Sequence, residues 1–258
     1  MAAALAASVA VGEEAQAMPQ AEREVRMELM RPGELEAAGR AFPAVYVPFG
    51  LIEWHGRHLP LGCDALKAHG ILVACARQAG GVVYPPVYFH DGFGRARMVP
   101  VLTRLFEGLK RTGFRVILGV SGHNVREQIA MIEEALAPVT ADGTVAGAGL
   151  WEVSLSQGPE CNTDHAAAWE TSDMMALHPD RVDLAALGAG PLAPDMKPPD
   201  GIGGLDPRAH ASANRGRRCI ELAAAAIGRK ARELLESLPP ERRALGIEAI
   251  APGKWWLI

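Results

Sequence analysis

Acidic residues and histidines gather in the segment Glu53–Asp64, and their side chains are of the kinds that bind divalent metal ions. Carboxylate oxygens and neutral imidazole nitrogens are the usual protein ligands of zinc and of harder divalent cations. Glu53 and His55 point to the same side of an extended segment, because side chains alternate along the backbone. A proline and a glycine before Asp64 permit a turn that brings Asp64 back towards them. Asp64 also stands where the N-cap of a following helix is expected, so capping is its alternative role.

His123 directly follows the clearest buried strand that the sequence predicts, the apolar run at residues 115–120. Glu53 and His55 likewise follow a predicted strand, residues 44–48. In open parallel α/β sheets, ligand sites lie at the carboxyl ends of the strands. The two clusters are therefore predicted to meet at one edge of the sheet.

A third polar cluster, residues 164–172, contains His165 and Glu170. In a functional interpretation, His165 is a proton-transfer group and Glu170 is a metal ligand or a substrate contact. The alternative is a helix start in which Asp164 is the cap and Glu170 lies on a solvated face. Cys63, next to Asp64, has two possible roles as well, a thiolate ligand or a small buried thiol.

Strands and helices alternate along the chain, which predicts βαβ units and a mainly parallel sheet. The predicted fold class is α/β, with one layered αβα domain at residues 25–258. Residues 1–24 are predicted to be a poorly ordered extension; they lack the basic start of a secretory signal, although export stays open. The predicted strands are 44–48, 82–84, 115–120 and 150–155, the predicted helices are 32–38, 66–78, 101–111, 125–137 and 214–238, and 187–206 is a long loop.

The composition predicts an ordinary soluble protein. The formal net charge of −4 argues against a nucleic-acid partner, because such proteins concentrate Lys and Arg and are usually basic. No apolar run reaches the roughly 18 residues that a membrane span needs, so no membrane partner is expected. Four widely spaced cysteines without a C-x-x-C pair do not suggest a disulfide framework, which favours a reducing, cytoplasmic location.

The order of these motifs resembles the creatininase (creatinine amidohydrolase) family. The resemblance rests on E-x-H-G-x-H-L-P-L-x-x-D from Glu53, on the strand that ends in Gly122-His123, and on H-x-x-x-x-E-T-S from His165. Residues 175–183 and 203–216 are similar to the segments that follow in that family. The likeness covers roughly residues 27 to 238.

The resemblance implies a creatininase-like fold with two divalent metal ions, zinc, with manganese or Fe²⁺ as alternatives. Glu53, Asp64 and His123 would bind one ion and His55 and Asp64 the other, so that Asp64 bridges them. A water between the ions would become a hydroxide that attacks an amide carbonyl. His165 would pass a proton to the leaving nitrogen.

The chain departs from the family at two places. Creatininase has a carboxylate two residues after the histidine that matches His123, and it completes the shell of the second ion; here that position is Val125, and Glu170 is the candidate to replace it. The loop within residues 87–100 is more than a dozen residues shorter than usual. Its Arg95 and Arg97 either meet an anionic substrate group or are exposed loop arginines. His58 matches no ligand and is either the partner of a carboxylate or a satisfied polar residue.

The resemblance implies a metal-dependent amidohydrolase that acts on a small amide, either a cyclic one such as creatinine or a formamide. The alternatives are a peptidase of the mycofactocin type and a catalytically inactive scaffold or binding protein. The family implies a homo-oligomer, a hexamer or another closed ring. The Trp255-Trp256 tail suits a subunit contact or packing on its own core.

Overall fold

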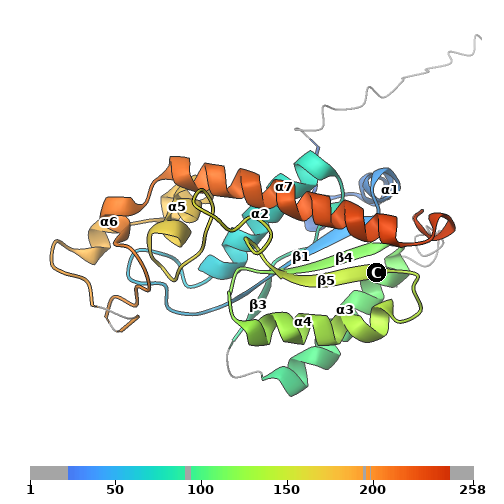
Figure 1. The fold of residues 1–258 in the computed structure, drawn as a ribbon, viewed down its shortest axis with the longest axis horizontal. Coiled ribbons are helices and arrows are strands. Elements are labelled where there is room, and N and C mark those ends of the chain that lie inside the picture. Colours follow the sequence, from blue (N-terminus) through green and yellow to red (C-terminus); the bar gives the residue numbers. More distant parts are fainter. Residues whose placement is uncertain (1–22, 91–93, 194–195, 198, 245–258) are drawn as a thin grey trace, which may run out of the picture.

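The computed structural model describes residues 23–90, 94–193, 196–197 and 199–244. Most of the predicted N-terminal extension and the Trp255-Trp256 tail lie outside these residues. The described chain forms a parallel sheet covered by helices on both faces, which confirms the predicted α/β class (Figure 1). None of the helices among the described residues is long and apolar enough to span a membrane.

The sheet has the strand order β2-β1-β4-β5, and β3 also pairs with β1. All of these pairings are parallel. Pro85 and Pro86 separate β2 from β3 on the same side of β1, because proline cannot donate to a strand ladder. The strands are β1 (Ala44–Leu51), β2 (Val82–Val83), β3 (Val87–Phe89), β4 (Val116–Ser121) and β5 (Ala146–Trp151).

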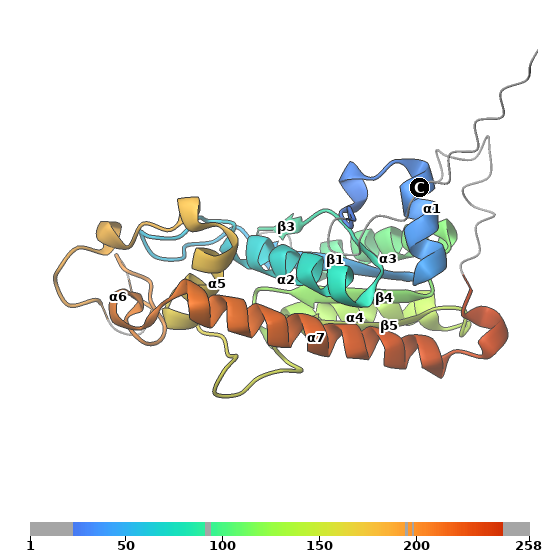
Figure 2. The ribbon, with the colours of Figure 1, turned by 90° about the horizontal axis from the view of Figure 1, so that it is seen from above.

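The helices pack on the two faces of the sheet according to the alternation of its side chains. Val45, Val47 and Phe49 belong to the core shared with α3 and α4, whereas Tyr46 belongs to the core shared with α2 and α7. Figures 1 and 2 show α2 and α7 on one side of the sheet, with α3 and α4 on the other. The helices are α1 (Pro32–Ala41), α2 (Cys63–Ala79), α3 (Arg95–Thr112), α4 (Arg126–Thr140), α5 (Ala168–Leu177), α6 (Pro207–His210) and α7 (Ala213–Ser237), with short 3-10 turns at Met27–Leu29, Pro179–Arg181, Leu184–Leu187 and Pro240–Arg242.

One predicted strand was placed wrongly. The sequence predicted residues 150–155, but β5 is Ala146–Trp151. Its first four residues, Ala-Gly-Ala-Gly, have no β-branched or aromatic side chain, so propensity did not indicate a strand there. Glu152 consequently lies at the carboxyl end of β5 and not within a strand.

The cysteines also differ from expectation, because Cys161 and Cys219 form a disulfide with 4.3 Å between their Cα atoms. The bond joins the segment after β5 to helix α7, and 58 residues separate the two cysteines in the chain. Such a pair leaves no local spacing signal, so the inference of a reducing compartment from cysteine spacing loses its support. Cys63 and Cys75 are free and buried.

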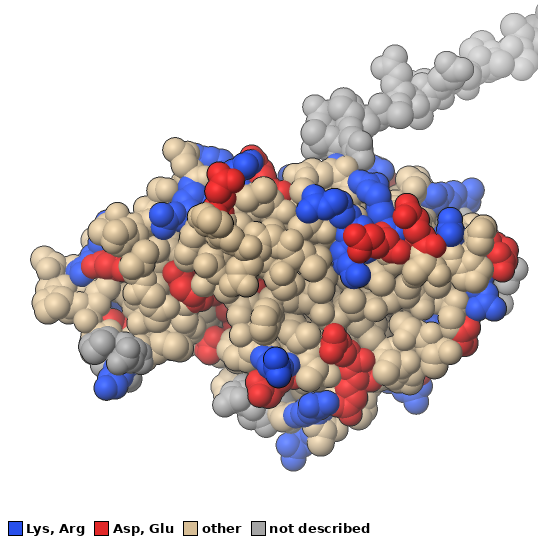
Figure 3. Space-filling model, viewed as in Figure 1, with Lys and Arg blue, Asp and Glu red and all other residues tan. Residues whose placement is uncertain are grey.

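Charged side chains on the face drawn in Figure 3 lie with both signs close together, and neither sign forms an extended patch there. Ion pairs between exposed groups occur among the described residues, such as that of Arg218 with Glu160.

The first turn of α2 lies directly against the ends of β1 and β4. A Cβ atom at Gly50 would come within 2.2 Å of the Ala65 nitrogen, and one at Gly122 would come within 2.0 Å of the Asp64 carbonyl oxygen. Side chains at these two positions would therefore displace the helix that carries Asp64.

We expect Gly122→Ala to lower the free energy of unfolding by about 3 kcal/mol. The added methyl group would meet the backbone of Asp64, and neither the end of β4 nor the first turn of α2 can move away without losing its packing contacts. Gly33→Ala in α1 is the matched control, since its Cβ would meet nothing within 4 Å. Urea denaturation of both variants measures the difference. Equal stability of the two variants would contradict the close packing of α2 on the strand ends.

Candidate metal centre

Asp64 lies between two histidines and faces them with different oxygens. Its Oδ1 is 2.9 Å from His55 Nε2, and its Oδ2 is 3.4 Å from His123 Nδ1. The Leu51 backbone N–H donates to Oδ2 at 3.1 Å, which fixes the carboxylate. Helix α2 begins at Cys63 after Gly62, so Asp64 belongs to the first turn and is not the N-cap that was the alternative. A carboxylate in this position presents one oxygen to each of the two histidines.

Glu53 and His123 complete one of the two groups around Asp64. Glu53 Oε1 lies 2.9 Å from His123 Nδ1, yet no hydrogen-bond donor of the described residues is aligned on this buried oxygen. The ligand atoms of Glu53, Asp64 and His123 all lie within 4.8 Å of one another. An oxygen without a donor beside an imidazole and a second carboxylate fits a divalent cation, whose ligands these groups commonly are.

His55 is fully buried and presents its Nε2 to the second group. Its Nδ1 lies 3.3 Å from the Glu53 carbonyl oxygen, to which it can only donate. This leaves the Nε2 lone pair of the neutral ring for a cation, in the way that metal-binding histidines are usually oriented. Glu170 Oε2 lies 3.6 Å from the same Nε2.

Glu170 is buried and does not lie on a solvated face. Its Oε2 accepts the Ala166 N–H at 2.8 Å, and Ala166 has an unusual positive φ of 52°. Asp164 accepts from the backbone nitrogens of Trp169 and Glu170, so it does hold the start of α5 as the alternative interpretation expected. The helix start and the site are therefore built from the same segment.

His165 lies beside His55, with 4.6 Å between the ring centroids. Its Nε2 is 3.0 Å from the Trp54 carbonyl oxygen, so this nitrogen must carry a proton and donate. The Nδ1 atom is consequently the one that can accept or release a proton. The ring is partly exposed.

Three other residues considered from the sequence take different roles. Cys63 is buried in a group with His55 and Glu170, and desolvation raises the pKa of its thiol well above the usual value. His58 Nε2 lies 2.9 Å from the Thr171 hydroxyl oxygen, and no ion pair of His58 with a carboxylate is found among the described residues. Arg95 forms an ion pair with Glu134 on α4.

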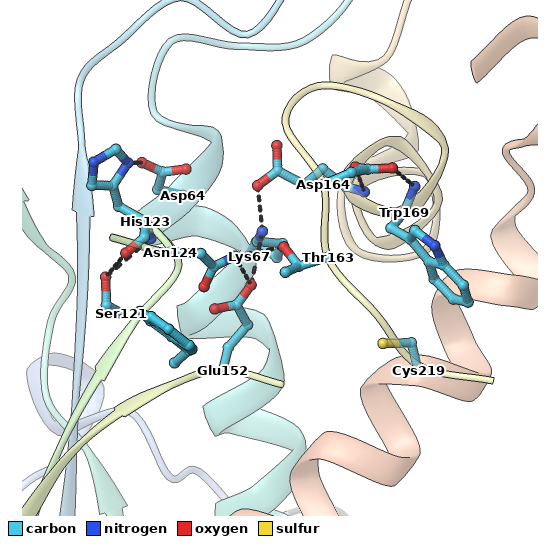
Figure 4. A network of polar contacts seen from close by, with 12 residues as sticks. Asp64, Lys67, Ser121, His123, Asn124, Glu152, Thr163, Asp164, Trp169 and Cys219 are labelled. Atoms are coloured by element: carbon cyan, nitrogen blue, oxygen red, sulfur yellow. Dashed lines mark hydrogen bonds and ion pairs between the residues drawn. The ribbon is translucent and has the colours of Figure 1, made fainter. Parts of the chain in front are cut away.

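Two charged residues of the site, Lys67 and Glu152, were not found from the sequence. Lys67 is completely buried, and its Nζ lies 2.9 Å from Glu152 Oε1 and 2.5 Å from Glu170 Oε1. Figure 4 shows Lys67 and Glu152 beside the pair formed by Asp64 and His123. The available signal for Lys67 was its place three residues after Asp64, on the same face of a helix. Glu152 was obscured by the wrong position of the last strand.

The electrostatic field of the cluster attracts positive charge. Burial lowers the pKa of His123, but its contacts with Asp64 and Glu53 outweigh this effect and raise the value to about 9. The pKa of His55 is also raised, since its contact with Asp64 and the charge of Glu170 exceed the effect of burial. Burial raises the pKa of Asp64, but both histidines together hold it well below its usual value. The carboxylates thus stabilise protons, or equally cations, on this edge of the sheet.

A cavity of about 150 Å³ opens next to His123. Polar groups of Gln128, Glu127 and Arg95 lie around it. The apolar part of its lining consists of Leu51, Phe89, Met98, Val125 and Met131. Val125, where creatininase has a carboxylate, therefore forms part of the apolar wall of this cavity.

A family model described as creatinine amidohydrolase, Creatininase, matches residues 28–230. The mycofactocin precursor peptide peptidases of Mycobacterium ulcerans and Mycolicibacterium smegmatis are 27% and 31% identical over 174 and 169 residues, which is 59% of this chain in each case. The matches cover 66% and 65% of those peptidases, just under two thirds of their length.

Solved structures of creatininase have the same fold. One creatinine amidohydrolase matches with a TM-score of 0.65 at 20% identity, covering 84% of this chain and 98% of its own. A structure named creatininase Mn matches with a TM-score of 0.63 at 22% identity, covering 84% and 99%. A mutant creatininase of the Zn-Zn type matches with a TM-score of 0.65 at 22% identity, covering 84% and 99%.

The free energy of unfolding should depend on pH through the protonation of the buried His58. Desolvation, together with the charge of His55, lowers the pKa of His58 to about 4 in the folded protein, against roughly 6.5 in an unfolded chain. Stability from this group is thus fully present above pH 6.5 and is lost as the pH falls towards 4. Between pH 7 and 4.5 the metal-free wild type should lose about 2 kcal/mol more unfolding free energy than His58→Gln.

Urea denaturation in the presence of a chelator measures this difference. His210→Gln, which removes an exposed imidazole on α6, is the control and should follow the wild type. Parallel pH curves for wild type and His58→Gln would show that His58 is protonated as readily in the folded chain as in the unfolded one.

Proposed function

Because the chain belongs to the creatininase family, we propose that it hydrolyses an amide C–N bond with the help of two divalent metal ions. The observation that carries the proposal is the Asp64 carboxylate, which turns one oxygen to His55 and the other to His123. Asp64 belongs with Glu53 and His123 to one group of potential ligands, and His55 belongs with Cys63 and Glu170 to another. The residues that would hold the ions are Glu53, His55, Asp64, His123 and Glu170.

Zinc or manganese suits this set of donors, which consists of imidazole nitrogens and carboxylate oxygens. The related creatininase structures named as Mn and Zn-Zn forms support the same choice. Bound ions would supply an acidified water and would polarise the substrate carbonyl.

The protein's own groups orient the reaction. Leu51 N–H holds Asp64, and the Glu53 carbonyl holds His55 through its Nδ1. His165 keeps a proton on Nε2 through the Trp54 carbonyl, so its Nδ1 would accept a proton released by the attacking water and pass it to the leaving nitrogen. These fixed orientations argue against the alternative of an inactive scaffold, which has no need of them.

The substrate class that the cavity favours is a peptide with an apolar side chain next to the scissile bond. A cavity of about 150 Å³ with an apolar wall beside His123 suits such a side chain better than a small polar cyclic amide. The names of the mycobacterial relatives, which are peptidases, support this choice. A cyclic amide or a formamide is the second candidate, supported by the creatininase structures.

Elemental analysis tests the metal centre. Protein purified without chelators should contain close to two zinc or manganese ions per chain, and Asp64→Ala should lose most of both because the bridge is gone. Asp180→Ala removes an exposed carboxylate and should keep both ions. A wild type without metal, even after incubation with Zn²⁺ or Mn²⁺, would favour the inactive scaffold.

Hydrolysis assays test the substrate class with creatinine, N-formyl amino acids and short peptides that differ in one apolar residue. We expect peptides with Leu or Phe to be cleaved, and Met98→Trp to lower kcat/KM for them about tenfold or more by filling the cavity. Met98→Leu, which conserves volume, should have little effect. Cleavage of creatinine that exceeds that of every peptide would favour the second candidate.

A further inference from the structure

A lysine ammonium lies inside the protein behind the candidate metal centre. Lys67 is on α2, one turn after Asp64, and its side chain is 0% exposed. A buried ammonium is costly unless it is paired and hydrogen-bonded. Its Nζ contacts Glu152 Oε1 at 2.9 Å and Glu170 Oε1 at 2.5 Å. Lys67 therefore joins two carboxylates that come from different parts of the chain.

The contact with Lys67 determines how Glu170 is oriented. Oε1 is bound by the ammonium, and Oε2 accepts the Ala166 N–H and lies 3.6 Å from His55 Nε2. A carboxylate that is held at both oxygens cannot rotate freely. The oxygen opposite Lys67 is thus kept on the side of His55.

Glu152 holds Lys67 from the other side. It follows β5 directly, and its Oε1 also accepts the Asn124 side-chain N–H at 3.3 Å. Asn124 donates to the Thr163 hydroxyl at 2.5 Å as well, so the segments after β4 and β5 and the one before His165 are joined (Figure 4). The ammonium therefore has a fixed place from which to hold Glu170.

We propose that Lys67 and Glu152 are positioning residues that hold Glu170 as the carboxylate ligand of the His55 ion, in place of the carboxylate missing at Val125. This inference rests on the proposed function. The positioning role of Lys67 differs from a repulsive role, in which the Lys67 charge would weaken cation binding at Glu170. The two roles predict opposite signs for the effect of removing the ammonium.

Metal titration distinguishes the two signs. Zn²⁺ or Mn²⁺ is titrated into the chelator-stripped, full-length protein against a chromophoric chelator. Lys67→Met/Glu152→Met removes the buried ion pair as a unit, which proteins often tolerate. We expect the ion that depends on Glu170 to bind about 10- to 100-fold more weakly and the other ion to bind as in the wild type.

Glu170→Gln should weaken the binding of the same ion. The triple variant Lys67→Met/Glu152→Met/Glu170→Gln should bind this ion no more weakly than Glu170→Gln alone. Lys67→Gln keeps a hydrogen-bond donor for Glu170 and should bind the ion more tightly than Lys67→Met. Lys110→Met, which removes a lysine paired with Asp142 on the surface, is the control for loss of charge.

Unchanged or tighter binding of both ions in the double variant would overturn the positioning role while leaving the two-metal function intact. Unchanged two-ion stoichiometry in Glu170→Gln would overturn it as well. A wild type that binds no ion would overturn the proposed function and this inference together. If the double variant does not fold, the comparison of Lys67→Gln with Lys67→Met decides, and equal affinities of these two would exclude positioning through the hydrogen bond.

Discussion

The close approach of helix α2 to the ends of β1 and β4 is the constraint on which the site depends. Gly50 and Gly122 leave no room for a side chain between the strands and the first helical turn. This contact seats Asp64 between the segments that follow the two strands. His55 and His123 belong to those segments, and they reach the two oxygens of one carboxylate for that reason. The packing of small residues thus determines the geometry of the charged ones.

The cluster has more carboxylates than fixed positive charges, which favours the binding of a cation. Glu152 and Glu170 lie against the Lys67 ammonium, and Glu53 and Asp64 lie against His123, so these four carboxylates in ionised form would exceed the one ammonium by three charges. Without metal, protons on His55 and His123 reduce this excess, which agrees with the raised pKa of both rings. Divalent ions would replace those protons and bind the same nitrogens. Burial that is costly for a lone carboxylate becomes favourable once cations share the site.

The chemistry of the site was more predictable from the sequence than its supporting contacts. Glu53, His55 and His123 follow strands that apolar runs indicate, and a parallel sheet brings strand ends to one edge. Lys67 lies within a helical pattern in which a single lysine resembles any solvated residue, because burial depends on the partners that tertiary packing supplies. Glu152 depended on the register of a strand made of Ala and Gly, for which propensity is uninformative. The disulfide between Cys161 and Cys219 depended on a contact over 58 residues.

Under the proposed function, Val125 helps to separate substrate selection in the cavity from metal binding at the carboxylates. A carboxylate at this position would add charge to the wall of the cavity next to His123, the place of the substrate group in the proposed function. With valine there, this part of the cavity wall is apolar. Glu152 and Glu170 lie around Lys67. Under the proposed function, apolar contact would select the substrate, while buried carboxylates would hold the cations. His123 belongs both to the cluster and to the lining of the cavity, whereas Met98 and Met131 line the cavity alone. Under the proposed function, a change at these two methionines would alter specificity with little effect on the charge balance of the cluster.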